Sequence, residues 1–332
     1  MTLSAAPTDS RALPGVALFA TGGTIAGSSA SKTDTTDYLP GAIGIADLLA
    51  AVPELAGVAR ISGEQVANVA SSDVDQAILL RLARALHEKL ADPAIAGAVV
   101  THGTDMLAES AFFIELTVRS PKPVVFVGAM RPATAISADG PMNLLNAVTL
   151  AASPAAAGRG TLIALNDRIG SAFYTQKTNS TALDTFRADE QGALGLFLSG
   201  QPRFYYEPAA PLGRPFFDIA GIEALPLVPI LYAHQDMGPA LIDAAIAGGA
   251  RGLVIAGSGN GTLPEPVKQR VAQLDGEGFV VVRASRAANG FVTPKKEGIA
   301  AGIYSASKAR WLLALALATG ATREQIRQYF SA

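Results

Sequence analysis

The chain has 332 residues, 49% of them hydrophobic, and a net charge of −2 at pH 7. Its Lys and Arg residues are scattered, and its apolar runs fall short of the about 18 residues that a membrane-spanning helix needs, so we expect neither a nucleic-acid nor a membrane partner. The absence of cysteine excludes disulfides and thiolate chemistry, and the three histidines have no metal-ligand spacing, so we expect no metal and no cofactor.

The beginning of the chain bears on its compartment. Residues 1–14 contain no apolar segment behind a basic start. We therefore expect a cytoplasmic protein, or a periplasmic one if a signal peptide has been removed.

Short apolar runs alternate with helical patterns along most of the chain, which predicts βαβ units and a mainly parallel sheet. In chain order, the first part favours strands at residues 16–20, 98–100, 124–127 and 161–165 and helices at 73–90, 105–118 and 143–152. Residues 201–229 are rich in proline and aromatic residues and lack periodicity, as is typical of a linker. The pattern then resumes, with strands at 228–232, 253–256 and 279–283 and helices at 239–247, 264–274 and 306–319.

This length favours two domains over one. We predict an α/β protein with a large N-terminal domain over residues 14–202, built on a mainly parallel sheet flanked by helices. A linker at 203–227 then leads to a smaller C-terminal α/β domain, also with a parallel sheet, at 228–332.

Two glycine turns that carry threonine are the main functional signal. Residues 21–24 (TGGT) and 101–105 (THGTD) each follow an apolar strand directly. Each turn therefore places a hydroxyl at the carboxyl end of a strand, where open α/β sheets bind their ligands. Glycine allows the backbone to approach a small ligand, and the backbone N–H groups can hold an anion or an oxyanion. The two turns predict one shared pocket.

The segment after the first turn has the composition of a mobile loop. Residues 27–37 are almost all small or polar, and they lead to Tyr38. A lid that brings a tyrosine over a threonine would exclude water when substrate is bound. The alternative is a solvated surface loop with no role.

A threonine hydroxyl needs a base before it can act as a nucleophile. The candidates are a neutral lysine and a tyrosine held near a carboxylate. Lys177 becomes a candidate only if the fold brings it to the turns, since a single lysine is usually a surface residue. His102, which has no adjacent carboxylate in the sequence, is more simply structural. The glycines at 257–261 lack a phosphate-loop spacing and can equally form a tight turn.

Several strings together resemble the bacterial type II L-asparaginases, and the similarity runs in order from about residue 15 to the C-terminus. They are ATGGTIAG at 20–27, GEQVAN at 63–68, THGTD at 101–105, VGAMRP at 127–132, SADGPMNLLN at 137–146, KTN at 177–179 and GSGNG at 257–261. The resemblance implies hydrolysis of L-asparagine to L-aspartate and ammonia through a threonine acyl-enzyme.

The resemblance also implies roles for individual residues. Thr24 matches the nucleophile, with Tyr38 and Glu297 as partners, although either threonine could attack first. The matching catalytic residues are Thr24, Thr104, Asp105, Lys177 and Tyr38. The matching substrate-binding residues are Ser71, Ser72, Asp105, Thr104, Asn260 and Glu297. Family members form homotetramers, as dimers of dimers, in which each site borrows residues from a neighbour, and the positions that match these residues are Asn260 and Glu297.

Two positions depart from the family pattern. Ser72 stands where Gln or Glu is usual and is too short to reach the substrate ammonium, which predicts weaker affinity and minor or no glutaminase activity. The loop before Glu297 is shorter and more basic than usual, which makes the alignment of this glutamate an open point.

Two other functions compete with asparagine hydrolysis. One is the related archaeal amidohydrolase subunit that acts on glutamyl-tRNA, although the present chain has no basic face for RNA. The other is an amino-acid sensor without catalysis, because a fold alone does not fix function. The presence of both threonines, Asp105 and Lys177 argues against a sensor.

Overall fold

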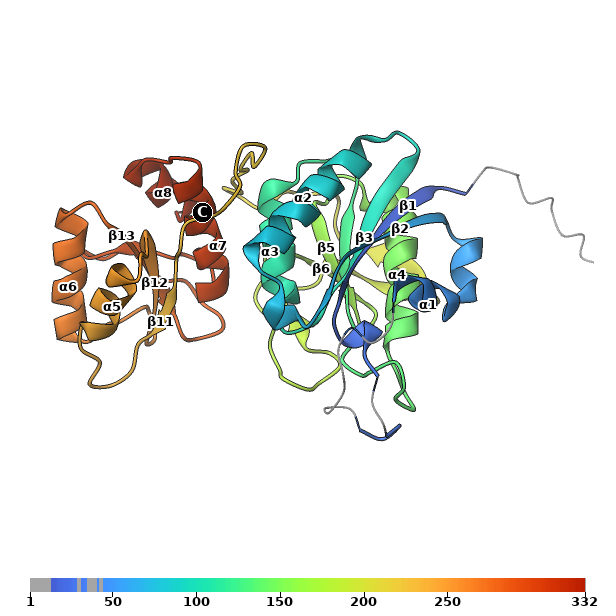
Figure 1. Ribbon diagram of the computed structural model, residues 1–332, viewed down its shortest axis with the longest axis horizontal. Helices are drawn as coiled ribbons and strands as arrows, with labels where there is room; N and C mark the ends of the chain where they lie inside the picture. The colour runs from blue at the N-terminus through green and yellow to red at the C-terminus, as the bar shows by residue number, and fades with distance from the viewer. Residues whose placement is uncertain (1–12, 29–30, 35–40, 42–43, 332) are drawn as a thin grey trace, which may run out of the picture.

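A computed structural model describes residues 13–28, 31–34, 41 and 44–331 of the chain. Two α/β lobes follow one another along the sequence, and each is built on its own sheet (Figure 1). The fold class is therefore the predicted one.

The N-terminal lobe is built on an eight-stranded sheet with the order β10-β9-β6-β5-β4-β3-β1-β2. Its strands are β1 (Gly15–Gly22), β2 (Arg60–Val69), β3 (Ile95–Thr101), β4 (Val124–Val127), β5 (Thr161–Leu165), β6 (Arg168–Ser171), β9 (Gly195–Leu198) and β10 (Gln201–Phe204). The first five strands are parallel, whereas β6, β9 and β10 pair antiparallel. A separate pair, β7 (Gln176–Lys177) and β8 (Phe186–Arg187), lies between β6 and β9 in the chain.

Helices cover both faces of this sheet (Figure 1). One face carries α2 (Gln76–Ala91) and α3 (Leu107–Thr117), and the other carries α1 (Ile45–Ala50) and α4 (Gly140–Ala152). Strand β1 is buried throughout because alternate residues pack on opposite faces, Phe19 with α2 and α3, and Leu18 with α4.

Local sequence explains where the longest helix begins and which side it buries. The Asp75 side chain accepts a hydrogen bond from the Ile78 N–H at 2.8 Å and caps the first turn of α2. Leu82, Leu86 and Leu90 recur at four-residue spacing and are all buried. The helix predicted at 73–90 therefore exists, beginning three residues later at Gln76.

The C-terminal lobe is built on a parallel four-stranded sheet with the order β11-β12-β13-β14. Its elements are β11 (Ile230–Tyr232), α5 (Ala240–Ala247), β12 (Gly252–Gly257), α6 (Glu265–Gly276), β13 (Val280–Ser285), β14 (Ile299–Ala300), α7 (Ala306–Ala318) and α8 (Arg323–Tyr329). Helices α5 and α6 share a core on one face. Helix α7 packs between this sheet and α3, so the two lobes have a continuous apolar core (Figure 1).

The sequence reading missed some elements at the edges of the large sheet. Strand β2 has a polar sequence because it lies at the edge of the sheet and is mostly exposed. The antiparallel strands β6, β9 and β10 were missed because each is only four residues long. Strand β10 ends at Phe204, two residues into the segment predicted as a linker. In the described part of the chain, no helix is both long and apolar enough to cross a membrane.

Candidate active site

The two glycine turns lie side by side because β1 and β3 are neighbours in the sheet. Their register pairs Ala20 with Thr101, and the Thr21 hydroxyl donates a hydrogen bond to the Thr101 carbonyl oxygen at 2.9 Å. Further along, a Cβ added to Gly23 would lie 2.2 Å from the Gly103 Cα, so the two backbones touch and leave no space for a side chain. Both turns are therefore at one edge of the sheet.

Thr24 comes directly after this contact. Gly22 and Gly23 have φ angles of 103° and 84°, a region that glycine tolerates best. The chain then enters a short 3-10 helix, η1 (Thr24–Ala26), whose residues are buried. The Gly23 N–H donates to the Val69 carbonyl oxygen at 3.1 Å. Of the amides expected to receive an oxyanion, that of Gly23 is therefore already engaged within the protein.

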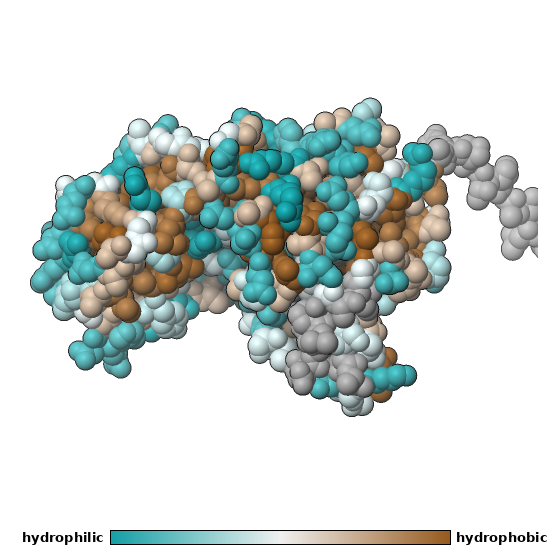
Figure 2. Space-filling view, viewed as in Figure 1, coloured by the Kyte–Doolittle hydropathy of each residue, from teal (hydrophilic) through white to brown (hydrophobic). Residues whose placement is uncertain are grey.

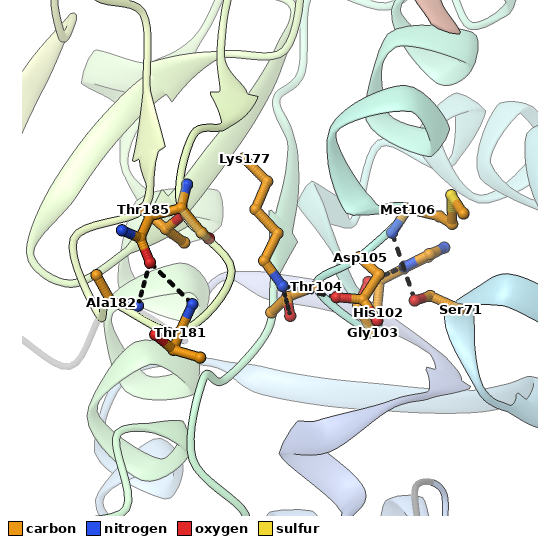
Figure 3. A network of polar contacts seen from close by, with 11 residues as sticks. Ser71, His102, Gly103, Thr104, Asp105, Met106, Lys177, Thr181, Ala182 and Thr185 are labelled. Atoms are coloured by element: carbon orange, nitrogen blue, oxygen red, sulfur yellow. Dashed lines mark hydrogen bonds and ion pairs between the residues drawn. The ribbon is translucent and has the colours of Figure 1, made fainter. Parts of the chain in front are cut away.

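Thr104, Asp105 and Lys177 form one hydrogen-bonded group (Figure 3). The Lys177 Nζ donates to Thr104 Oγ1 at 3.0 Å and to Asp105 Oδ1 at 2.6 Å. The Lys177 side chain is 15% exposed and that of Asp105 is 73% exposed, so the carboxylate faces solvent while the amine is largely enclosed. An amine this close to a hydroxyl can accept its proton when the amine is neutral.

Ser71 lies on the other side of the second turn, at the end of β2 (Figure 3). Its Oγ accepts a hydrogen bond from the Met106 N–H at 3.4 Å. A Cβ on Gly103 would lie 2.9 Å from the same oxygen, so Ser71 is packed against the turn itself. Ser71 is buried, whereas Ser72 is exposed. Of these two serines, only Ser71 is fixed beside Thr104 by the contacts seen.

His102 is fully buried between the turn and the core. Its Nδ1 is 2.8 Å from the Gly103 carbonyl oxygen, and its ring lies 5.9 Å from that of Phe126. Burial lowers the pKa of His102 to about 4, and the bond to Gly103 opposes the shift, so the imidazole is neutral at pH 7. Among the described residues, no cluster of three or more His, Asp or Glu side chains could hold a metal ion.

A third loop, after β4, reaches the same edge and was not assigned a role from the sequence. Asp139 accepts hydrogen bonds from the N–H groups of Met130 and Arg131 at 3.0 and 2.9 Å. Asn143 donates to the Gly128 carbonyl oxygen at 3.1 Å. A Cβ on Gly128 would lie 3.0 Å from Thr104 Cγ2, so this loop packs behind the threonine. The string SADGPMN thus has a supporting role at the site.

Tyr38 lies outside the residues that the structure describes. Described residues before and after Tyr38 are attached to neighbouring loops of the site. The Gly27 carbonyl oxygen accepts from the Ala133 N–H at 3.0 Å, and the Gly41 N–H donates to the Gly23 carbonyl oxygen at 3.2 Å. Gly27, whose N–H donates to the Thr24 carbonyl oxygen at 2.8 Å, and Gly41 are therefore both close to the first turn.

Comparison with known proteins identifies this arrangement. Residues 15–210 match the family described as "Asparaginase, N-terminal", and residues 227–330 match the "Glutaminase/Asparaginase C-terminal domain". The chain belongs to the asparaginase family. It is 48% identical over 320 residues to "Probable L-asparaginase 3" of Schizosaccharomyces pombe, covering 96% of the chain and 89% of that protein. It is 46% identical over 334 residues to "L-asparaginase 2" of Bacillus subtilis, covering 99% and 89%.

A solved structure agrees with the fold of this chain. The crystal structure of a probable cytoplasmic L-asparaginase from Campylobacter jejuni superimposes with a TM-score of 0.91 at 41% identity. The match covers 96% of this chain and 99% of that one. The two-lobed architecture is therefore that of an amidohydrolase family.

In the C-terminal lobe, one guanidinium holds the loops that carry Asn260 and Glu297. Arg283 is fully buried and donates to the carbonyl oxygens of Gly261, Thr293 and Glu297 at 3.1, 3.1 and 2.9 Å. Asn260 in turn accepts from the Thr293 N–H at 2.8 Å. Sequence reasoning missed Arg283, although a single charge inside the apolar strand β13 is a signal for such a role.

Proposed function

We propose that the chain hydrolyses the side-chain amide of L-asparagine to L-aspartate and ammonia. The observation that carries this proposal is the group formed by Lys177, Thr104 and Asp105, which lies against the turn that presents Thr24. Together with Thr24, this group provides two hydroxyls and an amine at one sheet edge. The names of the similar yeast, bacterial and Campylobacter proteins point to the same substrate.

The reaction proceeds in two halves. In the first, the Thr24 oxygen bonds to the amide carbon as Tyr38, acting as the phenolate, takes the hydroxyl proton; the carbon–nitrogen bond then breaks as Tyr38 gives that proton to the leaving nitrogen, releasing ammonia. An ester of L-aspartate remains on Thr24. In the second, Lys177 in its neutral form, acting through Thr104, takes a proton from water as the water oxygen bonds to the ester carbon. The bond from that carbon to the Thr24 oxygen then breaks, the proton returns to the Thr24 oxygen, and L-aspartate is released. Backbone N–H groups of the glycine turns, other than that of Gly23, stabilise the negative oxygen in both halves of the reaction.

Substrate recognition requires a hydrogen-bond acceptor for the α-ammonium group and a donor for the α-carboxylate of a small zwitterion. Asp105 is exposed beside the turn and offers a carboxylate to the α-ammonium group. Ser71 offers a hydroxyl to the α-carboxylate from the opposite side of the same turn. The pocket is therefore matched to a free amino acid.

A discriminating experiment compares ammonia release from L-asparagine by the wild type, Thr24→Ala and Thr104→Ala. Each variant should lose about a thousandfold or more in kcat while remaining folded. Thr149→Ala is a matched control, because Thr149 lies on α4 and its hydroxyl donates to the Leu145 carbonyl oxygen at 2.8 Å. Wild-type turnover in both site variants would overturn the proposal. Binding of L-asparagine by the wild type without ammonia release would favour a sensor instead.

A separate experiment determines which of the two threonines attacks the substrate first. Quenching the reaction with acid during turnover should leave an aspartyl ester on the peptide that contains Thr24, detected by mass spectrometry. An ester on the peptide that contains Thr104 would reverse the assignment.

The side chain of Ser72 bears on substrate preference. A serine leaves the substrate ammonium short of one partner, at a cost of about 1–3 kcal/mol. We expect weak or no ammonia release from L-glutamine, and a lower KM for L-asparagine in Ser72→Gln. Turnover of L-glutamine comparable with that of L-asparagine would contradict this.

We propose a homotetramer, organised as a dimer of dimers. Large apolar side chains are exposed on the single chain, including Tyr232 at 65% and Leu241 at 52% on the C-terminal lobe. Figure 2 shows hydrophobic areas interrupting the hydrophilic surface of that lobe. Sedimentation should give four times the chain mass of 34.0 kDa, and a monomer at working concentration would refute the assembly.

A cytoplasmic location is our proposal for the compartment. It is supported by the name of the structurally similar Campylobacter protein, while a 38% identical relative from Haemophilus influenzae is named as periplasmic. Release of the activity from host cells by osmotic shock alone would place it in the periplasm.

A further inference from the structure

Lys308 is a buried cation of the C-terminal lobe whose donors are all used by the N-terminal lobe. Its Nζ donates to the carbonyl oxygens of Ala172, Phe173 and Thr175 at 3.0, 2.7 and 2.9 Å. The residue is 3% exposed. An ammonium has three N–H donors, so these three carbonyls satisfy it completely.

The position of Lys308 is not one that stabilises its own helix. The residue lies in the first turn of α7, two positions after Ala306. The N-terminus of a helix carries partial positive charge, which disfavours a cation there. The ammonium group of Lys308 is therefore stabilised by the carbonyl oxygens of the N-terminal lobe and not by its own helix.

The three carbonyls belong to one tight turn between β6 and β7. Within it, the N–H groups of Tyr174 and Thr175 both donate to the Ser171 carbonyl oxygen, at 3.2 and 2.8 Å. The next residues are Gln176 and Lys177, which form β7. The backbone atoms that Lys308 holds thus end two residues before the amine that contacts Thr104.

Lys308 also contacts the element that leads away from Thr104. Its Nζ lies 5.4 Å from the centre of the Phe112 ring on α3, and α3 begins two residues after Asp105. The Phe112 ring is 5.5 Å from that of Phe173 in the held turn. One side chain therefore joins the two segments that bring Lys177 and Thr104 together.

Charges on neighbouring elements keep this cation compatible with burial. Burial lowers the pKa of Lys308 to about 7, and Glu115 and Glu109 on α3 oppose the shift. The three carbonyl oxygens favour the ammonium in the same sense as these carboxylates.

We propose that Lys308 is a positioning residue for the reaction: by holding the 172–175 turn, it keeps the Lys177 amine within hydrogen-bond distance of Thr104. This inference rests on the function proposed above, in which Lys177 acts through Thr104. A displacement of about 1 Å in a reacting group can cost about a hundredfold in rate. Ser71 and Asp105, which bind substrate, accept no hydrogen bond from Lys308 and lie outside the turn that it holds, so KM should change less than kcat.

The test measures kcat and KM for L-asparagine in Lys308→Met and Lys308→Gln. We expect kcat to fall by about tenfold or more, with KM within about twofold of the wild type. Hydrogen exchange of the amides at 172–178 should accelerate. The matched control is Lys122→Met, because Lys122 likewise donates to backbone carbonyls, those of Leu90 and Asp92 at 2.8 and 2.6 Å, but at the opposite end of β3 from the site. It should keep wild-type kcat.

A rescue experiment uses the absence of cysteine from the chain. Lys308→Cys introduces a single thiol, which 2-bromoethylamine alkylates in denaturant, restoring an ammonium at nearly the same reach. After refolding, the alkylated protein should recover most of the lost kcat, whereas the unalkylated protein should not. This variant also carries the test if Lys308→Met does not fold.

The outcomes separate the two proposals. Wild-type kcat in Lys308→Met or Lys308→Gln, alongside an inactive Lys177→Met, would overturn the positioning role and leave the proposed function intact. An equal loss of kcat in Lys122→Met, or no recovery on alkylation, would likewise overturn it. Wild-type kcat in Lys177→Met would instead remove the proposed mechanism itself.

Discussion

His102 ties the stability of the protein to pH through its burial next to the second turn. The folded-state pKa is lowered by burial to about 4 from an ordinary value of 6.5. Between these values the unfolded chain binds more protons than the folded one, so the free energy of unfolding falls as pH is lowered through this window. The full loss would be about 3 kcal/mol.

Urea unfolding of the wild type and His102→Asn at several pH values between 7 and 4 checks this, because the variant keeps a hydrogen-bonding group but has no charge to acquire. The wild type should lose more stability than the variant on acidification. Equal pH dependence in the two proteins would show that His102 titrates normally.

At the same scale, the sequence predicts residues of the site only where a local motif carries them. Thr104 and Asp105 stand in a glycine turn after a strand, so their placement at a sheet edge could be expected. Lys177 lies 73 residues from Thr104, and only the resemblance to a family selected it. Arg283 donates to three backbone carbonyls 10 to 22 residues away and Lys308 to three that are 133 to 136 residues away. No local motif marks either residue, and a single charged residue is usually at the surface.

At the scale of elements, the contact between the two glycine turns fixes how closely the ends of β1 and β3 approach. A substitution at Gly23 tests this contact. A Cβ there would lie 2.2 Å from the Gly103 Cα, so Gly23→Ala should push β1 and β3 apart at their ends. We expect a loss of about 3 kcal/mol or more in the free energy of unfolding and little remaining kcat. Chemical unfolding and the ammonia assay on the same preparation provide the measurement.

Gly278→Ala is the control for a positive φ. Gly278 has a φ of 80°, close to the 84° of Gly23, but a Cβ there meets nothing within 4 Å. Its loss should be about 1 kcal/mol, with unchanged kcat. If both variants lost the same stability, the cost would come from φ alone and not from the contact between the turns.

Elements with strong local patterns were predictable, and those defined by their neighbours were not. Strand β1 and helix α2 carry a continuous apolar run and a four-residue repeat, respectively, and both are found. Strands β9 and β10 pair antiparallel over four residues, too short for a pattern of alternation to stand out. Strand β2 is an edge strand, and its exposed residues resemble a loop in sequence.

For the whole molecule, the α/β class, with a large sheet followed by a smaller one, could be predicted from length and alternation, but the way the lobes join could not. Helix α7 is apolar on both sides because one side packs on its own sheet and the other on α3. The sequence of such a helix predicts that it is buried, but it does not indicate which elements pack against each side. The hydrogen bonds of Lys308 across this interface could not be predicted either, because its partners lie in the other lobe.

Assembly gives the last prediction, since Asn260 and Glu297 are proposed to serve a neighbouring subunit's site. If so, Thr24→Ala and Glu297→Ala, each inactive alone, should restore activity when co-expressed. In a mixed dimer one site has both mutated residues, whereas the other combines an intact Thr24 from one chain with an intact Glu297 from its partner. Random mixing makes half of the dimers mixed, with one of two sites intact, so about a quarter of wild-type kcat should return.

Co-expression of Thr24→Ala with Lys177→Ala is the control. Lys177 contacts Thr104 of its own chain, so Thr24 and Lys177 are expected to serve the same site and every site keeps one defect. Recovery in the control but not in the first pair would mean that Glu297 acts within its own subunit and Lys177 across the interface, the reverse of the proposed arrangement.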